Sequence, residues 1–172
     1  MADGPTDRST GRDIPQPVLR PAAAGDAAGI AEIWYHGWRD GHLGHVPPAL
    51  LPHRELTHFR RRVPDRLAET TVALVEGQLA GFVTVRGDEV EQVYVTASAR
   101  GGGTATALLD HAERQIAEQH PTAWLAVVAG NARARRFYER NGWRDAGAVD
   151  YLAEVDAGTL PVPCRRYEKR VR

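Results

Sequence analysis

The spacing of apolar residues changes near the middle of the chain. Residues 89–95 are rich in Val and Tyr and alternate with period two, which predicts a β-strand. From residue 105 the apolar positions follow a spacing of i, i+3, i+4, i+7 and i+11, which is one face of a helix. These positions are Ala105, Leu108, Leu109, Ala112 and Ile116. A strand, a glycine-rich turn and a helix therefore follow one another in this stretch.

The N-terminal part of the chain predicts a strand, two helices and a hairpin. Residues 17–21 form a short strand bounded by prolines, which favours a sheet edge. Asp26 is the expected N-cap of the first helix. The second helix is expected after Pro47 and Pro48. Its apolar residues are Leu50, Leu51, Leu56 and Phe59. Residues 71–75 and 79–85 predict two strands joined by a tight turn at 76–78.

The C-terminal part predicts three strands and one more helix. Residues 124–128 are continuously apolar, which is typical of a strand buried on both faces. A helix is expected from Gly130-Asn131 to Asn141-Gly142, where the glycine suits a left-handed C-terminal cap. Two further strands are expected near residues 143–155 and 165–171, with Pro161 and Pro163 in the loop between them.

This order of elements predicts a mixed α/β fold with helices on both faces of one sheet. The strands at 89–95 and 124–128 are joined by a crossover helix, so they should run parallel in a right-handed βαβ unit. The length of 172 residues fits one domain over residues 17–172. Residues 1–16 are polar and rich in Gly, Pro and Asp, which predicts a disordered tail.

The turn at residues 100–103, Arg-Gly-Gly-Gly, opens the central helix and predicts an anion site. Unpaired amides at a helix start, together with the positive end of the helix dipole, favour a phosphate group. A nucleotide triphosphate loop would need a lysine that is absent here. A dinucleotide fingerprint would need a third glycine where Thr106 stands, and an acidic residue further on.

The pattern that remains is Arg-x-x-Gly-x-Gly/Ala, met by Arg100, Gly103 and Ala105. It resembles the acyl-CoA pyrophosphate loop of the GCN5-related N-acetyltransferases. Residues 131–143 resemble a second motif of that family, Asn-x-x-Ala-x-x-x-Tyr followed by Gly-Phe/Trp. The resemblance extends over residues 17–171 in element order. It implies the acyl-CoA N-acyltransferase fold, a mostly antiparallel twisted sheet with a central parallel strand pair.

The resemblance implies acetyl-CoA as the cofactor, with CoA as the product. The strand before the loop would pair with the pantetheine arm, and the amide of Val95 or its neighbour would face the thioester oxygen as an oxyanion donor. The implied cofactor-binding residues are Val93, Tyr94, Val95, Arg100, Gly101, Gly102, Gly103, Thr104, Ala105, Asn131 and Arg135. Asn131 can also serve as a helix cap, and the two roles are compatible.

Three residues are candidates for acid–base chemistry. The phenol of Tyr138 is protonated at neutral pH and could protonate a departing thiolate, unless it is a buried tyrosine bonded to a carbonyl. Glu89 and Glu91 should share a strand face with Val93 and Val95, because side chains alternate. Either carboxylate could take a proton from an ammonium substrate, and Glu91 fits the family spacing better. A solvated strand end remains the alternative.

The acceptor side of the site is less defined by sequence. The family resemblance points to the first helix pair and the last strands, which makes Trp38, His42 and Tyr151 the candidate substrate residues. Trp38 also fits the helix core. His42-x-x-His45 lacks the further ligands of a metal set, so no metal is expected.

The composition of the chain argues against several classes of binding partner. Lys+Arg and Asp+Glu are both 22, so no nucleic-acid partner is indicated, and no apolar run predicts a membrane span or a signal peptide. A single cysteine, Cys164, fits a reducing cytoplasm, and without a nearby His/Asn grouping it is not expected to be a catalytic thiol. The family resemblance leaves a homodimer open.

Together these features predict an N-acetyltransferase that acetylates a primary amine, of a small molecule or a peptide, by direct attack in a ternary complex. Most of the motifs would also serve binding alone. The alternative hypothesis is therefore a non-catalytic sensor that binds CoA or acyl-CoA. A protein that binds nucleotide phosphates is a third hypothesis.

Overall fold

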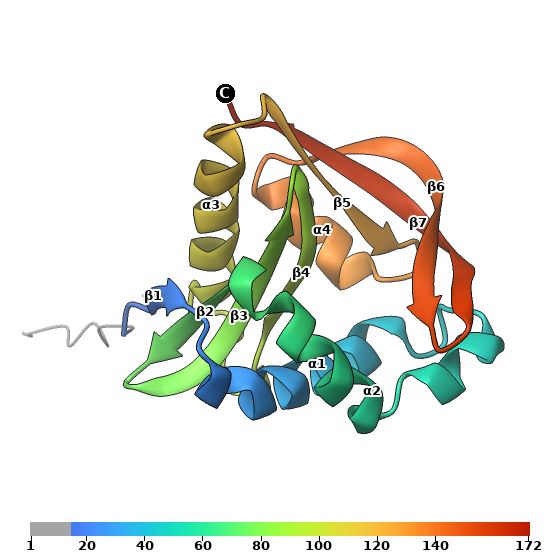
Figure 1. Ribbon diagram of the computed structural model, residues 1–172. Coiled ribbons are helices and arrows are strands. Elements are labelled where there is room, and N and C mark those ends of the chain that lie inside the picture. The colour runs from blue at the N-terminus through green and yellow to red at the C-terminus, as the bar shows by residue number, and fades with distance from the viewer. Residues whose placement is uncertain (1–14) are drawn as a thin grey trace, which may run out of the picture.

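The computed structural model describes residues 15–172, so residues 1–14 of the predicted tail lie outside the described part. The protein forms a seven-stranded mixed sheet in the order β1-β2-β3-β4-β5-β7-β6, with helices on both faces (Figure 1). Among the strands of this described part, only β4 and β5 run parallel. The strands are β1 Val18–Pro21, β2 Thr70–Val75, β3 Gln78–Arg86, β4 Glu89–Val95, β5 Thr122–Val128, β6 Arg144–Val155 and β7 Gly158–Arg170. This confirms the predicted fold class and the edge position of β1.

Within residues 15–172, four α-helices accompany the sheet: α1 Ala27–His42, α2 Leu56–Arg62, α3 Thr104–Ala117 and α4 Ala132–Arg140. The prediction of one second helix was wrong, because the structure has a 3-10 segment, η2 Pro48–His53, followed by the short α2. Pro52 lies inside η2, and a proline there removes a backbone donor and crowds the preceding turn. The chain therefore bends between η2 and α2, and this bend holds Arg54.

The β2–β3 turn and the C-terminal cap of α4 form where the sequence predicts them, and both use left-handed backbone positions. Glu76 and Gly77 have φ of 51° and 77°, so both central residues of the β2–β3 turn are left-handed. Such a two-residue turn matches the twist of the flanking strands. Gly142, predicted to cap α4, has φ of 82°.

The placement of Pro161 and Pro163 in a loop was wrong. Both lie inside β7, opposite Leu152 and Asp150 of β6. β5 ends at Val128, opposite Cys164, so the earlier part of β7 has a strand on one side only. A proline is tolerated where its missing N–H would have pointed to an open edge. The β6–β7 hairpin therefore extends beyond β5.

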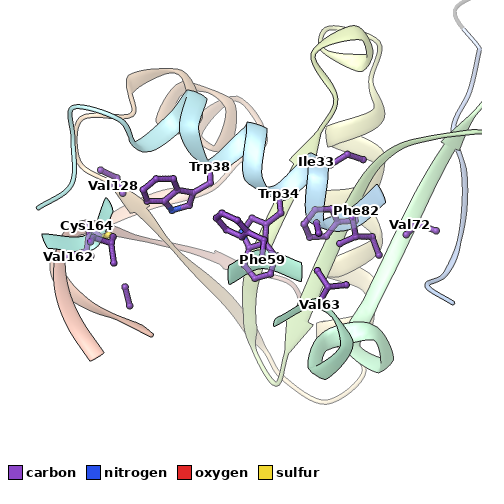
Figure 2. Packing of buried hydrophobic residues seen from close by; sticks show 14 residues of the cluster. Ile33, Trp34, Trp38, Phe59, Val63, Val72, Phe82, Val128, Val162 and Cys164 are labelled. Atoms are coloured by element: carbon purple, nitrogen blue, oxygen red, sulfur yellow. The ribbon is translucent and has the colours of Figure 1, made fainter. Parts of the chain in front are cut away.

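Two hydrophobic clusters fill the two faces of the sheet. One packs α3 and α4 against β3, β4 and β5. The other packs α1 and α2 against the opposite face and the β6–β7 hairpin. Figure 2 shows this second cluster running from Val128 and Cys164 through Trp38 and Trp34 to Phe82. Trp34 lies 5.1 Å from Phe59 and 6.2 Å from Phe82, measured between ring centroids.

Glu89 and Glu91 were predicted to share a strand face with Val93 and Val95, and a bulge in β4 shows that this prediction was wrong. Thr84 pairs with Gln92 and Val85 with Val90, which leaves Glu91 as an extra residue. One extra residue breaks strict alternation, so side chains before and after it change faces. Val93 and Val95 face the α3 cluster. Glu91 instead contacts Arg66, which follows α2, and Glu89 contacts Tyr151 of the opposite cluster.

Candidate active site

The site begins where the two parallel strands separate. Glu89 of β4 pairs with Trp124 of β5, and this is the single register pair recorded between the two strands in the described chain. Figure 1 shows the strands close together at this end and diverging toward the other. A cavity of about 780 Å³ opens between them, lined by β4, the Arg100–Ala105 loop, α1, α4 and the β6–β7 hairpin.

The open edge of β4 presents backbone donors to this cavity. The amide of Thr96 donates to Ala80 O at 2.8 Å, toward β3. Amides alternate in direction along a strand, so those of Val93 and Val95 point away from β3, toward the gap. Both residues line the cavity. The side chain of Tyr94 lies on the other face, 5.9 Å from Phe82 between ring centroids, and packs against Gly37 of α1.

The glycine-rich loop takes a shape that requires glycine. Gly101 and Gly103 have φ of 77° and 82°, in the left-handed region. The amide of Ala107 donates to Gly103 O at 2.9 Å, so the amides of Thr104 and Ala105 precede the helical ladder. Gly101, Gly103 and Ala105 line the cavity, whereas the Thr104 side chain is buried. Gly102 is not among the lining residues.

Two further predicted cofactor residues behave differently from one another. Asn131 caps α4, because its Oδ1 accepts from the Ala134 amide at 3.1 Å, and it also lines the cavity. Arg135 does not line the cavity, because its guanidinium donates to the Tyr167 hydroxyl and pairs with Asp145. On a helix, positions two apart face different sides. Arg133 and Arg140 line the cavity instead.

Around the loop, Arg100 lines the cavity and pairs with Asp40 of α1. This ion pair joins the loop to the first helix. Arg100, Arg133 and Arg140 all line the cavity, and together they are its basic rim.

Tyr138 lies in the wall of the cavity with 9% of its surface exposed. Its ring packs 5.2 Å from Phe137 and 6.2 Å from Trp143, between centroids. Burial raises the pKa of the Tyr138 phenol, so the group stays protonated at neutral pH. No hydrogen bond joins its hydroxyl to another atom of residues 15–172. The hydroxyl is therefore available as a donor to a ligand.

The two glutamates of β4 have different surroundings. Glu91 is held by Arg66 Nε at 3.0 Å, with Arg86 and Arg62 within 4.0 Å. Glu89 accepts a 2.9 Å hydrogen bond from the Tyr151 hydroxyl. Burial raises the pKa of Glu89, partly offset by that hydrogen bond. Of these two glutamates, Glu89 is the one without an arginine partner within residues 15–172.

The predicted acceptor residues line the same cavity. The Trp38 and His42 rings stack 4.9 Å apart, and His42 Nδ1 bonds Trp38 O at 2.9 Å. Burial lowers the pKa of His42 to about 4, so its ring is neutral at pH 7. Trp38, His42 and Tyr151 all line the cavity.

Sequence reasoning missed two polar residues of this wall, Arg54 and Gln92. Arg54 precedes three consecutive arginines, Arg60 to Arg62, and arginine is usually a surface residue, yet Arg54 is 5% exposed. Gln92 is buried because the bulge at Glu91 turns it toward the helix pair. No pattern in the sequence marks either residue.

The chain offers the features that a CoA thioester needs. Free amides on β4 suit the peptide-like pantetheine arm, the amides that precede α3 suit pyrophosphate, and the basic rim suits further phosphate. The cavity is wide enough for a cofactor arm and an acceptor together, since ligand pockets commonly span about 300–1,000 Å³. The residues present therefore fit acetyl-CoA.

Comparison with known families decides the assignment. The sequence model described as the Acetyltransferase (GNAT) family matches residues 28–143. The chain belongs to this family. It is thus an acyl-CoA N-acyltransferase, and acetyl-CoA is its cofactor. The motif-bearing stretch from the central strand to Trp143 lies inside the match, which confirms the resemblance stated above.

Solved structures show the same fold. A GCN5-related N-acetyltransferase from Rhodopseudomonas palustris is 20% identical, with a TM-score of 0.70 over 90% of this chain and 96% of its own. YncA, a putative acetyltransferase from Salmonella typhimurium solved with acetyl-CoA, is 16% identical, with a TM-score of 0.67 over 91% and 95%. The PaiA N-acetyltransferase from Thermoplasma acidophilum, in complex with coenzyme A, is 15% identical, with a TM-score of 0.63 over 90% and 99%.

A search of curated protein sequences finds no match. Among residues 15–172, no helix is both long and apolar enough to cross a membrane. The same residues contain no group of three or more His, Cys, Asp or Glu side chains suited to a metal ion.

Proposed function

We propose that this GNAT enzyme transfers an acetyl group from acetyl-CoA to a primary amine by direct attack in a ternary complex. The observation that carries the proposal is a convergence in one cavity. The open amides of β4, the glycine loop and the unbonded hydroxyl of Tyr138 line the same space as Glu89. A binding module would need the first two, whereas transfer to an amine also needs an acid and a base.

When bound, acetyl-CoA supplies an activated acetyl thioester. The pyrophosphate would be held by the amides from Gly101 to Ala105, with Arg100 providing countercharge. The amide of Val95 is a fixed donor for negative charge that develops on an oxygen beside β4. It costs no rearrangement during the reaction, because β3 holds the strand in place.

Tyr138 is proposed as the acid that protonates the departing thiolate. The raised pKa of its phenol keeps the group protonated at neutral pH, so the proton is present when the thiolate departs. Its ring is fixed by Phe137, Trp143 and Tyr167, so the hydroxyl direction is set by packing. Such fixed orientation is a large part of what makes a catalytic group effective.

Glu89 is proposed as the base that takes a proton from the ammonium form of the acceptor, through water where the distance requires it. Its raised pKa makes it a stronger base than an exposed carboxylate, and Tyr151 orients it. The family resemblance had favoured Glu91 as the base. Its contacts with Arg66, Arg62 and Arg86 favour a structural role instead.

The test is release of free CoA from acetyl-CoA in the presence of a panel of primary amines, with CoA binding measured by calorimetry. The panel contains amino acids, a polyamine, an aminoglycoside and a peptide with a free N-terminus. We expect CoA release that depends on one class of amine. Tight CoA binding without release from any amine would contradict the proposal and favour a sensor. Affinity for ATP or NAD equal to that for CoA would contradict the loop assignment.

A further inference from the structure

Arg54 is a buried cation on the acceptor side of the cavity. It follows η2, and its side chain is 5% exposed although it lines the cavity. Its Nη1 donates to His53 O at 2.7 Å and approaches His58 Nε2 at 3.2 Å. The guanidinium carbon lies 5.9 Å from the centroid of the Trp38 ring. These contacts fix the plane of the guanidinium.

The contacts of Arg54 leave part of its hydrogen-bonding capacity unused. Both recorded bonds involve Nη1, so the donors on Nε and Nη2 have no recorded partner within residues 15–172. Neither of these two nitrogens is sealed from solvent, so both can be reached by a ligand. An Nε/Nη2 edge presents two parallel N–H groups, the arrangement that binds a carboxylate in bidentate fashion.

No carboxylate of the described chain forms an ion pair with Arg54, although Glu154 and Asp156 act on its charge from a greater distance. Within residues 15–172, no acidic oxygen lies within 4.0 Å of the Arg54 guanidinium. The nearby Glu154 carboxylate is engaged by Arg62 at 2.8 Å and by Arg66 at 3.5 Å. Burial lowers the pKa of Arg54 to about 10, which still leaves it charged at pH 7. A buried charge without a counterion is costly, so such a group calls for an anionic ligand.

The neighbours of Arg54 suit the rest of a small amine. Trp34, Trp38, Leu50 and Phe59 supply an apolar wall of the same cavity. Gln92 also lines it, and its Oε1 is buried without a partner. On β4, Glu89 provides the carboxyl group proposed to receive the ammonium proton. The cavity thus offers a cationic group and a carboxyl group on different walls.

We propose that Arg54 binds a carboxylate of the acceptor, so that the acceptor is a free amino acid or a similar small amine that carries an acid group. This inference rests on the proposed function, since it assigns the substrate class of that same site. An amino acid carries a carboxylate and an amine a few bonds apart. The carboxylate would bind Arg54, and the amine would give its proton to Glu89. A polyamine or an aminoglycoside would instead place positive charge against Arg54, and a protein N-terminus has an amide at the corresponding position.

The experiment compares matched acceptors. Each proteinogenic L-amino acid is assayed beside its carboxamide, which keeps the amine and the side chain and removes the charge. We expect at least one acid to exceed its carboxamide in kcat/KM by on the order of 100-fold, because a polar site rejects an analogue that leaves its groups unpaired. In Arg54→Gln this ratio should fall to near one, and Arg54→Lys should restore part of it.

Three controls separate recognition from folding. Arg60→Gln removes an exposed arginine of α2 that does not line the cavity, and should leave the ratio unchanged. CoA affinity and melting temperature report whether Arg54→Gln is folded. Calorimetric binding of the best amino acid in the presence of CoA should weaken on the order of 100-fold in Arg54→Gln, a readout that does not depend on turnover.

The outcomes are distinct. A ratio near one in the wild-type protein, or an unchanged ratio in folded Arg54→Gln, would overturn the carboxylate assignment while leaving amine acetylation intact. Preferred turnover of a polyamine, an aminoglycoside or a peptide N-terminus would overturn it as well. Absence of turnover with any amine, despite CoA binding, would overturn the proposed function and the substrate class with it.

Discussion

The Tyr151 hydroxyl donates a hydrogen bond of 2.9 Å to Glu89 Oε1, which joins the β6–β7 hairpin to the first residue of β4. The two residues are 62 positions apart in sequence. The bond stabilises the ionised carboxylate, whereas burial of Glu89 favours the protonated form. Burial is the larger effect, so the pKa of Glu89 is raised overall. The Tyr151 contact therefore tunes and orients the proposed base.

Replacing Tyr151 with Phe should shift the pH dependence of the reaction. The variant loses the hydrogen bond that lowers the pKa of Glu89, so that pKa rises further. A base works when it is deprotonated, and the acidic limb of the kcat/KM profile should therefore move to higher pH. In Glu89→Gln the rate should fall by about 10²–10⁴-fold and this limb should disappear. If the acidic limb of Tyr151→Phe stays where it is in the wild type, the limb does not report the ionisation of Glu89.

Glu91→Gln is the matched control for Glu89→Gln, because it removes the charge of the neighbouring glutamate. It leaves Arg66, Arg62 and Arg86 without their shared carboxylate. We expect a loss of about 3 kcal/mol in the free energy of unfolding, from a partly buried ion-pair network, with the acidic limb retained. Denaturant unfolding and the pH profile measure the two effects separately. If the acidic limb of the pH profile is lost in a folded Glu91→Gln, then Glu91 and not Glu89 is the base.

Tyr138→Phe should lower kcat by about 10²–10⁴-fold with little change in CoA affinity, because only the proton donor is removed. The ring and its packing against Trp143 are preserved. Tyr35→Phe is the control, since Tyr35 lies on α1 and does not line the cavity. Steady-state kinetics and calorimetry with CoA measure the effect. Equal kcat in Tyr138→Phe and wild type would exclude the acid role.

Gly103→Ala tests the loop. Its φ of 82° is strained for alanine, although a Cβ there would meet no atom within 4 Å. We expect a loss of about 1 kcal/mol in the free energy of unfolding and a weaker affinity for CoA, because relief of the strain rotates the amides that precede α3. Gly25→Ala is the matched control, because its Cβ also has open space and its φ is not left-handed. Equal CoA affinity in both variants would argue against binding of pyrophosphate by this loop.

His58→Gln tests the support of Arg54. Burial lowers the pKa of His58 to about 4, so the folded protein binds fewer protons than the unfolded chain between that value and about 6.5. This contribution to stability is complete above pH 6.5 and is lost as the pH falls toward 4. His58→Gln keeps an acceptor for Arg54 without titrating, so its melting temperature should fall less over that range. The exposed His36→Gln should follow the wild type.

Sequence pattern was sufficient for the elements whose residues carry strong local signals. The helical face of α3, the tight turn after residue 75 and the left-handed cap at Gly142 are local properties, and each was correctly placed. The failures depend on long-range context. The bulge at Glu91 is set by the register with β3, and Pro161 fits β7 because β5 ends before it. Neither fact is visible in a single strand.

The same distinction holds for the site. The motif residues Gly103, Asn131 and Tyr138 do meet at one cavity, as family resemblance implied. Arg54 was missed because an arginine among arginines indicates a surface, and only the fold shows which of them turns inward. The position of Arg135 was not visible in the sequence, because the packing of Tyr138 and its neighbours decides which face of α4 meets the cavity.

Direct attack in a ternary complex is the central claim, and Cys164 is the residue that could contradict it. Its thiol lines the cavity, but burial raises its pKa to about 11, so little thiolate is present at pH 7. The decisive measurement is mass spectrometry of protein and amine after one turnover, with acetyl-CoA added before or together with the amine. We predict an acetylated amine only when both substrates are present, and a protein of unchanged mass. An acetylated protein that passes its acetyl group to the amine would contradict the account.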